Sequence, residues 1–173
     1  SSNGLAAGCS LEQAGLHALT EVVERHHVQH WWLQHGLFQP AVQLTASAEP
    51  KLQALLQRCA QLQLKVLLWD LSAAAVWPCV AVLLIAQPDG QSAASGLFTG
   101  YGCQPDLALA IQSAVLEAVQ SRLTLITGSR DDLDYPQYQL CRQSEFQAQL
   151  WNHHRHAVAY VGPAPANDNQ QAN

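Results

Sequence analysis

Two stretches of the sequence place acidic and basic side chains at helical spacing. The first stretch, HALTEVVER at 17–25, ends with two glutamates and an arginine: Glu21, Glu24 and Arg25. The second stretch, SAVLEAVQSR at 113–122, has a related order: Glu117, Gln120 and Arg122. Residues three apart lie on the same side of a helix, so two such helices packed together would bring their carboxylates to one place. Converging carboxylates suit a hard cation such as Mg²⁺, and the arginines suit phosphate oxygens.

The same spacing has a simpler explanation. A Glu-x-x-Glu-Arg pattern is common on helix faces that point to solvent, where charged side chains need no ligand. Charged residues make up only 12% of this chain, so clusters of them are less expected here. Spacing alone leaves both a metal–phosphate site and a solvated surface open.

The histidines form a second set of candidate ligands. They fall in two groups: His17, His26, His27, His30 and His35, then His153, His154 and His156. His26 and His30 are four apart and could bind a metal from one helix face. Because no closely spaced cysteine or carboxylate ligand accompanies them, we expect solvated or partly packed histidines. A histidine-rich metal-binding protein without a phosphate-binding site is the alternative.

Three further side chains have a structural and a functional interpretation. Cys103 could act as a nucleophile, but no cysteine–histidine spacing supports that role, and we expect a small loop residue. Trp31 and Trp32 could form a peptide-docking surface. Packing of both rings in the core is the favoured interpretation.

Composition narrows the class of protein. The 173 residues are enough for one domain with its own core, and 49% of them are apolar. The formal net charge is −5 and no basic run is present, which argues against a nucleic-acid partner. The longest apolar run, at 73–86, is interrupted by Pro78 and is too short to span a bilayer. Five cysteines without a CxxC pair indicate reduced thiols in a cytoplasmic protein.

Capping residues and apolar spacing predict the first elements. Ser10 and Gln13 form a capping pattern that predicts a helix ending near Trp32. Its expected apolar side consists of Leu11, Ala14, Ala18, Leu19 and Val22. A second amphipathic helix is predicted at 49–62. Its stripe consists of Leu52, Leu55, Leu56, Cys59 and Leu62.

The middle of the chain predicts strands and a third helix. Two strands are expected at 64–71 and 78–86, with a short link that suits antiparallel pairing. A turn at 88–90 and a glycine-rich loop at 96–106 follow. Pro105 should open the next helix in its first turn. The apolar side expected for that helix consists of Ala108, Ile111, Ala114, Val115, Ala118 and Val119.

The sequence patterns that predict secondary structure become weaker toward the end of the chain. A short helix and a strand are expected before residue 162, and the polar, proline-bearing segment 163–173 is expected to be disordered. The element order helix–helix–strand–strand–helix predicts an α+β domain over 1–162, with antiparallel strands packed with long helices.

Two long blocks resemble the YcaO family. The first is SSNGLAAG…EQAGLHALTEVVERH, within the motif block 1–27. The second is GYGCQPDLALAIQSAVLEAVQSRLTLITGSRDDL at 100–133, which contains most of the motif block 96–132. The family pattern has Ser-Asn-Gly-Leu-Ala-x-Gly, then Glu-Ala and Glu-x-x-Glu-Arg, and later Glu-Ala-x-Gln-Ser-Arg with Gly-x-Arg-Asp-Asp close behind. VLLWDLSAAAVWPCVAVLL also fits a strand pair between these blocks. The resemblance covers about residues 1–135 and implies a partial YcaO-like domain.

The resemblance implies a particular chemistry. YcaO proteins bind ATP and Mg²⁺, phosphorylate a peptide-bond oxygen and so activate its carbon toward a nucleophile. A neighbouring Cys, Ser or Thr side chain gives an azoline ring, as in cyclodehydratases, and external sulfide gives a thioamide. The implied Mg²⁺ ligands are Glu21, Glu24 and Glu117. The implied ATP-site residues are Gln13, Arg25, Gln120 and Arg122.

Departures from the family pattern keep a second interpretation open. Cys9 replaces a usual Asn, Gln13 replaces a Glu, and Ser113 replaces an Arg. The upstream block Ser-x-x-x-Glu-x-x-Glu is absent and the chain contains no Met, so we expect part of a larger enzyme that modifies a peptide or protein. A partner biosynthetic protein and a homodimer are left open. The alternative is a degenerate YcaO scaffold that binds a peptide or partner without catalysis.

Overall fold

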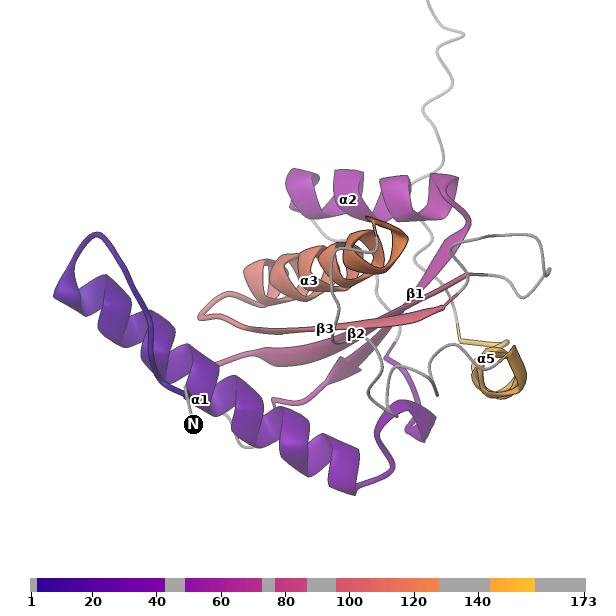
Figure 1. The fold of residues 1–173 in the computed structure, drawn as a ribbon, viewed down its shortest axis with the longest axis horizontal. Coiled ribbons are helices and arrows are strands. Elements are labelled where there is room, and N and C mark those ends of the chain that lie inside the picture. The colour runs from indigo at the N-terminus through magenta and orange to yellow at the C-terminus, as the bar shows by residue number, and fades with distance from the viewer. Residues whose placement is uncertain (1–2, 43–48, 73–76, 87–95, 128–143, 158–173) are drawn as a thin grey trace, which may run out of the picture.

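The computed structural model describes residues 3–42, 49–72, 77–86, 96–127 and 144–157. Helices cover both faces of a three-stranded sheet, which confirms the expected α+β class (Figure 1). The expected turn at 88–90, the last expected strand and the expected disordered tail at 163–173 lie outside the described residues. Within the described ranges, no helix combines the length and apolar character needed to cross a membrane.

The sheet consists of β1 (Leu64–Asp70), β2 (Cys79–Ala86) and β3 (Leu97–Cys103). The strands are antiparallel and lie in the order β1-β2-β3. Both strands expected from the sequence are therefore confirmed. The central strand β2 is buried along nearly its whole length, as a strand covered on both faces must be.

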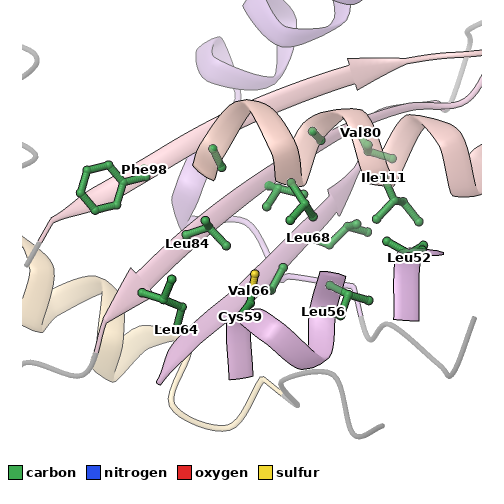
Figure 2. Close-up of a cluster of buried hydrophobic side chains, with 14 of the residues drawn as sticks. Leu52, Leu56, Cys59, Leu64, Val66, Leu68, Val80, Leu84, Phe98 and Ile111 are labelled. Atoms are coloured by element: carbon green, nitrogen blue, oxygen red, sulfur yellow. The ribbon is translucent and has the colours of Figure 1, made fainter. Parts of the chain in front are cut away.

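The helices α2 (Pro50–Gln61) and α3 (Leu107–Thr127) cover one face of the sheet. Figure 2 shows Leu52, Leu56 and Cys59 of α2 facing the apolar side chains of β1. The expected stripe of α2 is confirmed except at Leu62, which is 53% exposed beyond the helix end. The expected apolar side of α3 packs in the same cluster.

The start of α3 is set by an aspartate rather than by the proline. Asp106 Oδ1 accepts a hydrogen bond from the backbone N–H of Leu109 at 2.9 Å. This bond satisfies one of the free N–H groups of the first turn. The helix therefore begins at Leu107, and Pro105 lies before it.

The other face of the sheet is covered by α1 (Leu11–Leu33), the short 3₁₀ helix η1 (Gly36–Phe38) and α5 (Ser144–His153). Trp31, Leu37 and Leu150 bring these three elements into a second apolar cluster with the sheet. The expectation that both tryptophans pack in the core is half right. Trp31 is buried, but Trp32 is 44% exposed.

Two histidines fasten α5 to η1. The ring Nε2 atoms of His153 and His154 lie 2.8 Å and 2.6 Å from the backbone oxygens of Phe38 and Leu37. His154 is only 3% exposed. The expectation of solvated or partly packed histidines is therefore wrong for His154, because its ring fills a site between the helix end and Trp69.

The expected glycine-rich loop at 96–106 is wrong over most of its length, because residues 97–103 form β3. The glycines allow a close approach instead of a turn. A Cβ atom at Gly100 would lie 2.1 Å from the backbone oxygen of Ala114, and one at Gly102 would lie 2.1 Å from that of Ala110. Glycine is required where a helix backbone lies this close to a strand.

The beginning of α1 is as the sequence predicts. Ser10 Oγ accepts a hydrogen bond from the Gln13 N–H at 3.2 Å. The Gln13 side chain accepts one from the backbone N–H of Cys9 at 2.8 Å. These bonds satisfy backbone donors at the start of the helix, which would otherwise lack partners.

The expected apolar side of α1 is wrong. Leu11, Leu19 and Val22 are 90%, 52% and 46% exposed, whereas Thr20 and Trp31 are buried. In Figure 1 the first half of α1 extends beyond the sheet, so the sheet packs against its second half. A helix with apolar residues on several sides does not reveal from sequence alone which side faces the core.

Candidate nucleotide and metal site

Glu24 and Glu117 meet at the outer edge of β3. Glu24 extends from α1 on one face of the sheet, where the backbone N–H of Cys103 favours its ionised form. Glu117 extends from α3 on the other face, and its Oε2 accepts one from the backbone N–H of Tyr101 at 3.1 Å. These two N–H groups lie two residues apart in one strand. The sequence-based expectation that the two helices bring these carboxylates together agrees with this arrangement.

A pocket of about 720 Å³ opens at this point. Its lining includes Glu24, Arg25, Tyr101 and Glu117, together with His30 and other α1 residues. The pocket therefore combines two carboxylates, a guanidinium group and an aromatic ring. Such a mixture suits a charged ligand that carries a cation.

The surroundings of Glu24 and Glu117 disfavour the ionised form of both carboxylates when no cation is bound. Burial raises the pKa of Glu24 from 4.5 to about 7, and the nearby charge of Glu117 adds to this effect. Loss of hydration also raises the pKa of Glu117, while the Tyr101 N–H and Arg25 act in the opposite direction. A cation between the two side chains would favour their ionised forms.

Glu21 is held by protein donors on both carboxylate oxygens. Arg25 Nε donates to Oε1 at 2.9 Å, and the backbone N–H of Gly4 donates to Oε2 at 3.2 Å. Glu21 thereby holds the Arg25 side chain near the pocket and fastens the segment that precedes α1. Its expected role as a Mg²⁺ ligand stays a prediction.

The structure does not place the other expected ligands in the pocket lining. Gln13 lies at the start of α1 and uses its amide oxygen to accept the Cys9 N–H. Gln120 is exposed on α3. Arg122 lies five residues after Glu117, which turns its side chain about 140° away from that glutamate. Their expected ATP-site roles stay predictions.

Arg122 points toward α2 instead. Its charge acts on the thiol of Cys59, and within the described part of the chain its buried Nε makes no hydrogen bond. This position is separated from the Glu24–Glu117 pair by the body of α3. Among the described residues, no three His, Cys, Asp or Glu side chains lie together in a way that could hold a metal.

Sequence reasoning missed Tyr101 as a pocket residue. The Trp32 Nε1 atom donates to the Tyr101 hydroxyl at 3.1 Å, which links the end of α1 to β3. Recognition of β3 as a strand would have revealed this position, because Tyr101 and Cys103 then share the face that α1 covers.

The same strand buries Cys103, and burial raises the pKa of its thiol. A raised pKa is unfavourable for a nucleophile.

Comparison with protein families identifies the fold and its relatives. The family model described as YcaO cyclodehydratase, ATP- and Mg²⁺-binding, matches residues 1–172. The chain belongs to the YcaO family. An uncharacterised protein from Rhizobium leguminosarum bv. trifolii, encoded in the tfuA 3′ region, is 33% identical to this chain over 161 residues. That match covers 87% of this chain and 37% of the relative, so the chain spans little more than a third of that protein.

Solved structures show the same fold. The YcaO protein of Methanopyrus kandleri, bound with AMPPCP and Mg²⁺, has a TM-score of 0.64 and 21% identity, over 94% of this chain and 41% of the other. A heterocyclase in complex with substrate and cofactor has a TM-score of 0.60 and 30% identity, over 78% of this chain and 17% of the other. The YcaO-like fold expected from the sequence is thereby confirmed.

Proposed function

We propose that this chain forms part of the ATP–Mg²⁺ site of an enzyme that activates peptide backbone amides. The observation that carries the proposal is the meeting of Glu24 and Glu117 at the edge of β3. The YcaO membership supports it, since the family is described as ATP- and Mg²⁺-binding.

The residues at the pocket fit such a ligand. A Mg²⁺ ion in a nucleotide site is commonly bound by one or two carboxylates, with phosphate oxygens and water completing its six positions. Glu117 accepts the Tyr101 N–H, which orients its carboxylate and leaves oxygen lone pairs for a cation, and Glu24 lines the same pocket. Arg25, held by Glu21, lines the pocket, and in this proposal it pairs with phosphate oxygens. When bound, Mg²⁺ would neutralise charge on the phosphates.

The proposed substrate is a backbone amide of a peptide or protein. Transfer of a phosphoryl group to the amide oxygen makes that oxygen a good leaving group. The nucleophile that then attacks the carbon decides the product: a neighbouring Cys, Ser or Thr side chain leads to an azoline, and sulfide leads to a thioamide. This chain matches less than half of the length of these two proteins. The proposed site therefore includes further ligand-binding groups from outside the matched region.

Calorimetry with AMPPCP and Mg²⁺ tests this function. We expect binding by the unchanged chain and at least about tenfold weaker binding by the Glu24→Gln and Glu117→Gln variants, because each loses one charge at the cation. Glu12→Gln is the matched control, since Glu12 is exposed in the first turn of α1. Equal affinity in all four proteins would contradict the proposal.

A second function is favoured by one observation. Gln13 replaces an expected acidic residue, and its side chain accepts the Cys9 N–H instead of lining the pocket. A scaffold that binds peptides without nucleotide would tolerate this replacement. Cys-, Ser- and Thr-containing peptides, titrated in the presence of EDTA and without nucleotide, test it. Peptide binding that is insensitive to Glu24→Gln would favour this second function over the first.

A further inference from the structure

Two cysteines lie opposite each other on neighbouring strands of the sheet. Cys79 begins β2 and Cys103 ends β3, and the two residues are direct partners in the antiparallel register. Both are free thiols, 0% and 2% exposed, in the apolar cluster on the face that α1 covers. Directly opposite residues place their side chains on the same face of a sheet. The two thiols are therefore neighbours in one layer of the core.

The hydrogen bonds at the end of β3 identify the kind of strand pair that the cysteines form. The backbone N–H of Gln104 donates to the Pro78 oxygen at 3.1 Å, which makes the preceding pair a hydrogen-bonded one. Hydrogen-bonded and non-hydrogen-bonded pairs alternate along an antiparallel ladder, so Cys79 and Cys103 form a non-hydrogen-bonded pair. The Cα atoms of such a pair lie about 4.5 Å apart, and a disulfide needs about 4.4–6.8 Å. The backbone therefore already has a separation that an S–S bond can span.

The two cysteines differ in how firmly their strands are held. The Cys79 oxygen accepts the Leu71 N–H at 2.8 Å, and the Cys79 N–H donates to Ser72 Oγ at 3.0 Å. These bonds fix Cys79 on the side of β1. Cys103 belongs to β3, which is an edge strand in the described sheet. Small movements that bring the sulfur atoms into bonding geometry can therefore come from β3.

We propose that Cys79 and Cys103 form a reversible disulfide by exchange with a low-molecular-weight disulfide such as glutathione disulfide. The Cys103 thiol loses its proton to solvent, and its sulfur attacks one sulfur of the small disulfide, which releases one thiolate. The deprotonated Cys79 sulfur then attacks the Cys103 sulfur of the mixed disulfide and releases the second thiolate. The two released thiolates take up two protons. The protein dithiol is thereby oxidised, and the small disulfide is reduced to two thiols.

The surroundings of the pair make this exchange slow. The thiolate is the attacking form, and burial in an apolar cluster disfavours it. Local opening of the β3 edge is needed to admit the oxidant. Once formed, the S–S bond fastens the end of β3 to β2, beside the backbone N–H that acts on Glu24. The exchange itself requires neither nucleotide nor cation.

Equilibration in glutathione buffers tests the proposal. The full chain is incubated with mixtures of reduced and oxidised glutathione in EDTA, without nucleotide, until the composition no longer changes. Free thiols are then alkylated, and peptides are analysed by mass spectrometry. Cleavage at aspartates, which include Asp89, separates the peptide of Cys79 from that of Cys103. We expect these two peptides to be joined, with the loss of two hydrogen atoms, and to separate again when the buffer is made more reducing.

Cysteine variants provide the controls. Cys79→Ala and Cys103→Ala should each abolish the cross-linked species. Cys59→Ala is the matched control, since Cys59 is 3% exposed but lies in the cluster on the other face of the sheet (Figure 2). It should leave the exchange unchanged. Circular dichroism establishes that the variants fold, and the peptide analysis of the unchanged chain does not depend on them.

Three results would overturn the proposal. They are full alkylation of Cys79 and Cys103 at every glutathione ratio, disulfides that join other cysteines instead, and a cross-link that a more reducing buffer does not remove. The proposed function has a separate outcome, because the exchange is measured without nucleotide. Failure to bind AMPPCP and Mg²⁺ by a chain that forms the disulfide would count against the proposed function alone.

Discussion

Replacement of Glu24 by glutamine should stabilise the folded chain at alkaline pH while it weakens cation binding. The carboxylate has lost part of its hydration and lies near Glu117, so the folded state favours the protonated form. A glutamine side chain at this position would keep the size of glutamate and one carbonyl oxygen but would carry no charge. The substitution therefore removes an unfavourable ionisation with little change in shape.

The sign and size of the effect follow from the pKa. The pKa of Glu24 is raised from 4.5 to about 7, so between these pH values the folded state binds more protons than the unfolded state. The free energy of unfolding therefore falls as the pH rises through this window and stays lower above it. A full shift would correspond to about 3 kcal/mol, and partial solvent access reduces the expected gain for Glu24→Gln at pH 8 to about 1–3 kcal/mol.

Urea unfolding, followed by tryptophan fluorescence, measures this difference. Both proteins are unfolded at pH 5 and at pH 8 in EDTA, and the change between the two pH values is compared. Histidine titrations are common to both proteins and cancel in that comparison. Glu12→Gln should match the unchanged chain at both pH values. A Glu24→Gln variant that is less stable at pH 8, or that keeps the pH dependence of the unchanged chain, would refute the reasoning.

Two other changes test the packing. Gly100→Ala should lower the free energy of unfolding by about 1–3 kcal/mol, because its Cβ would meet the Ala114 backbone. Gly15→Ala has open space and should raise it by about 0.5–1 kcal/mol; urea unfolding that gives both changes the same sign would contradict this difference. Burial lowers the pKa of His154, so the folded state favours the neutral ring. The contribution of this ring to the free energy of unfolding is therefore fully present above pH 6.5 and is lost as the pH falls below that value. NMR titration of its ring should show the lowered pKa, and a value above 6.5 would refute it.

The sequence predicts the helices of this fold better than its third strand. Ser10 and Gln13 mark the start of α1 because capping depends on local hydrogen bonds that a few residues determine. Gly100 and Gly102 suggest a loop because glycine weakens a strand in isolation. Their role depends on α3, whose backbone at Ala114 and Ala110 passes directly over Gly100 and Gly102. Local patterns contain no information about that approach.

The candidate site divides in the same way. Glu24 and Glu117 could be paired from sequence because each lies on a helix that repeats a similar order of residues. Arg122 belongs to the same repeat, yet helical geometry turns it toward α2. Tyr101 was hidden because its strand was not recognised. Helical phase therefore relates Glu24 to Glu117, whereas membership of the same motif does not bring Arg122 beside them.

The hydrogen bonds at β3 have a consequence for solubility. In the described sheet β3 is an edge strand; Glu117 accepts the N–H of Tyr101, and Glu24 lies close enough to the N–H of Cys103 for that group to lower its pKa. Exposed edge strands invite pairing with strands of other molecules, and inward-turned charges are one way in which proteins prevent it. The two glutamates therefore protect this edge from aggregation. Selection to keep the chain soluble could preserve both carboxylates even in a descendant that has lost all catalysis.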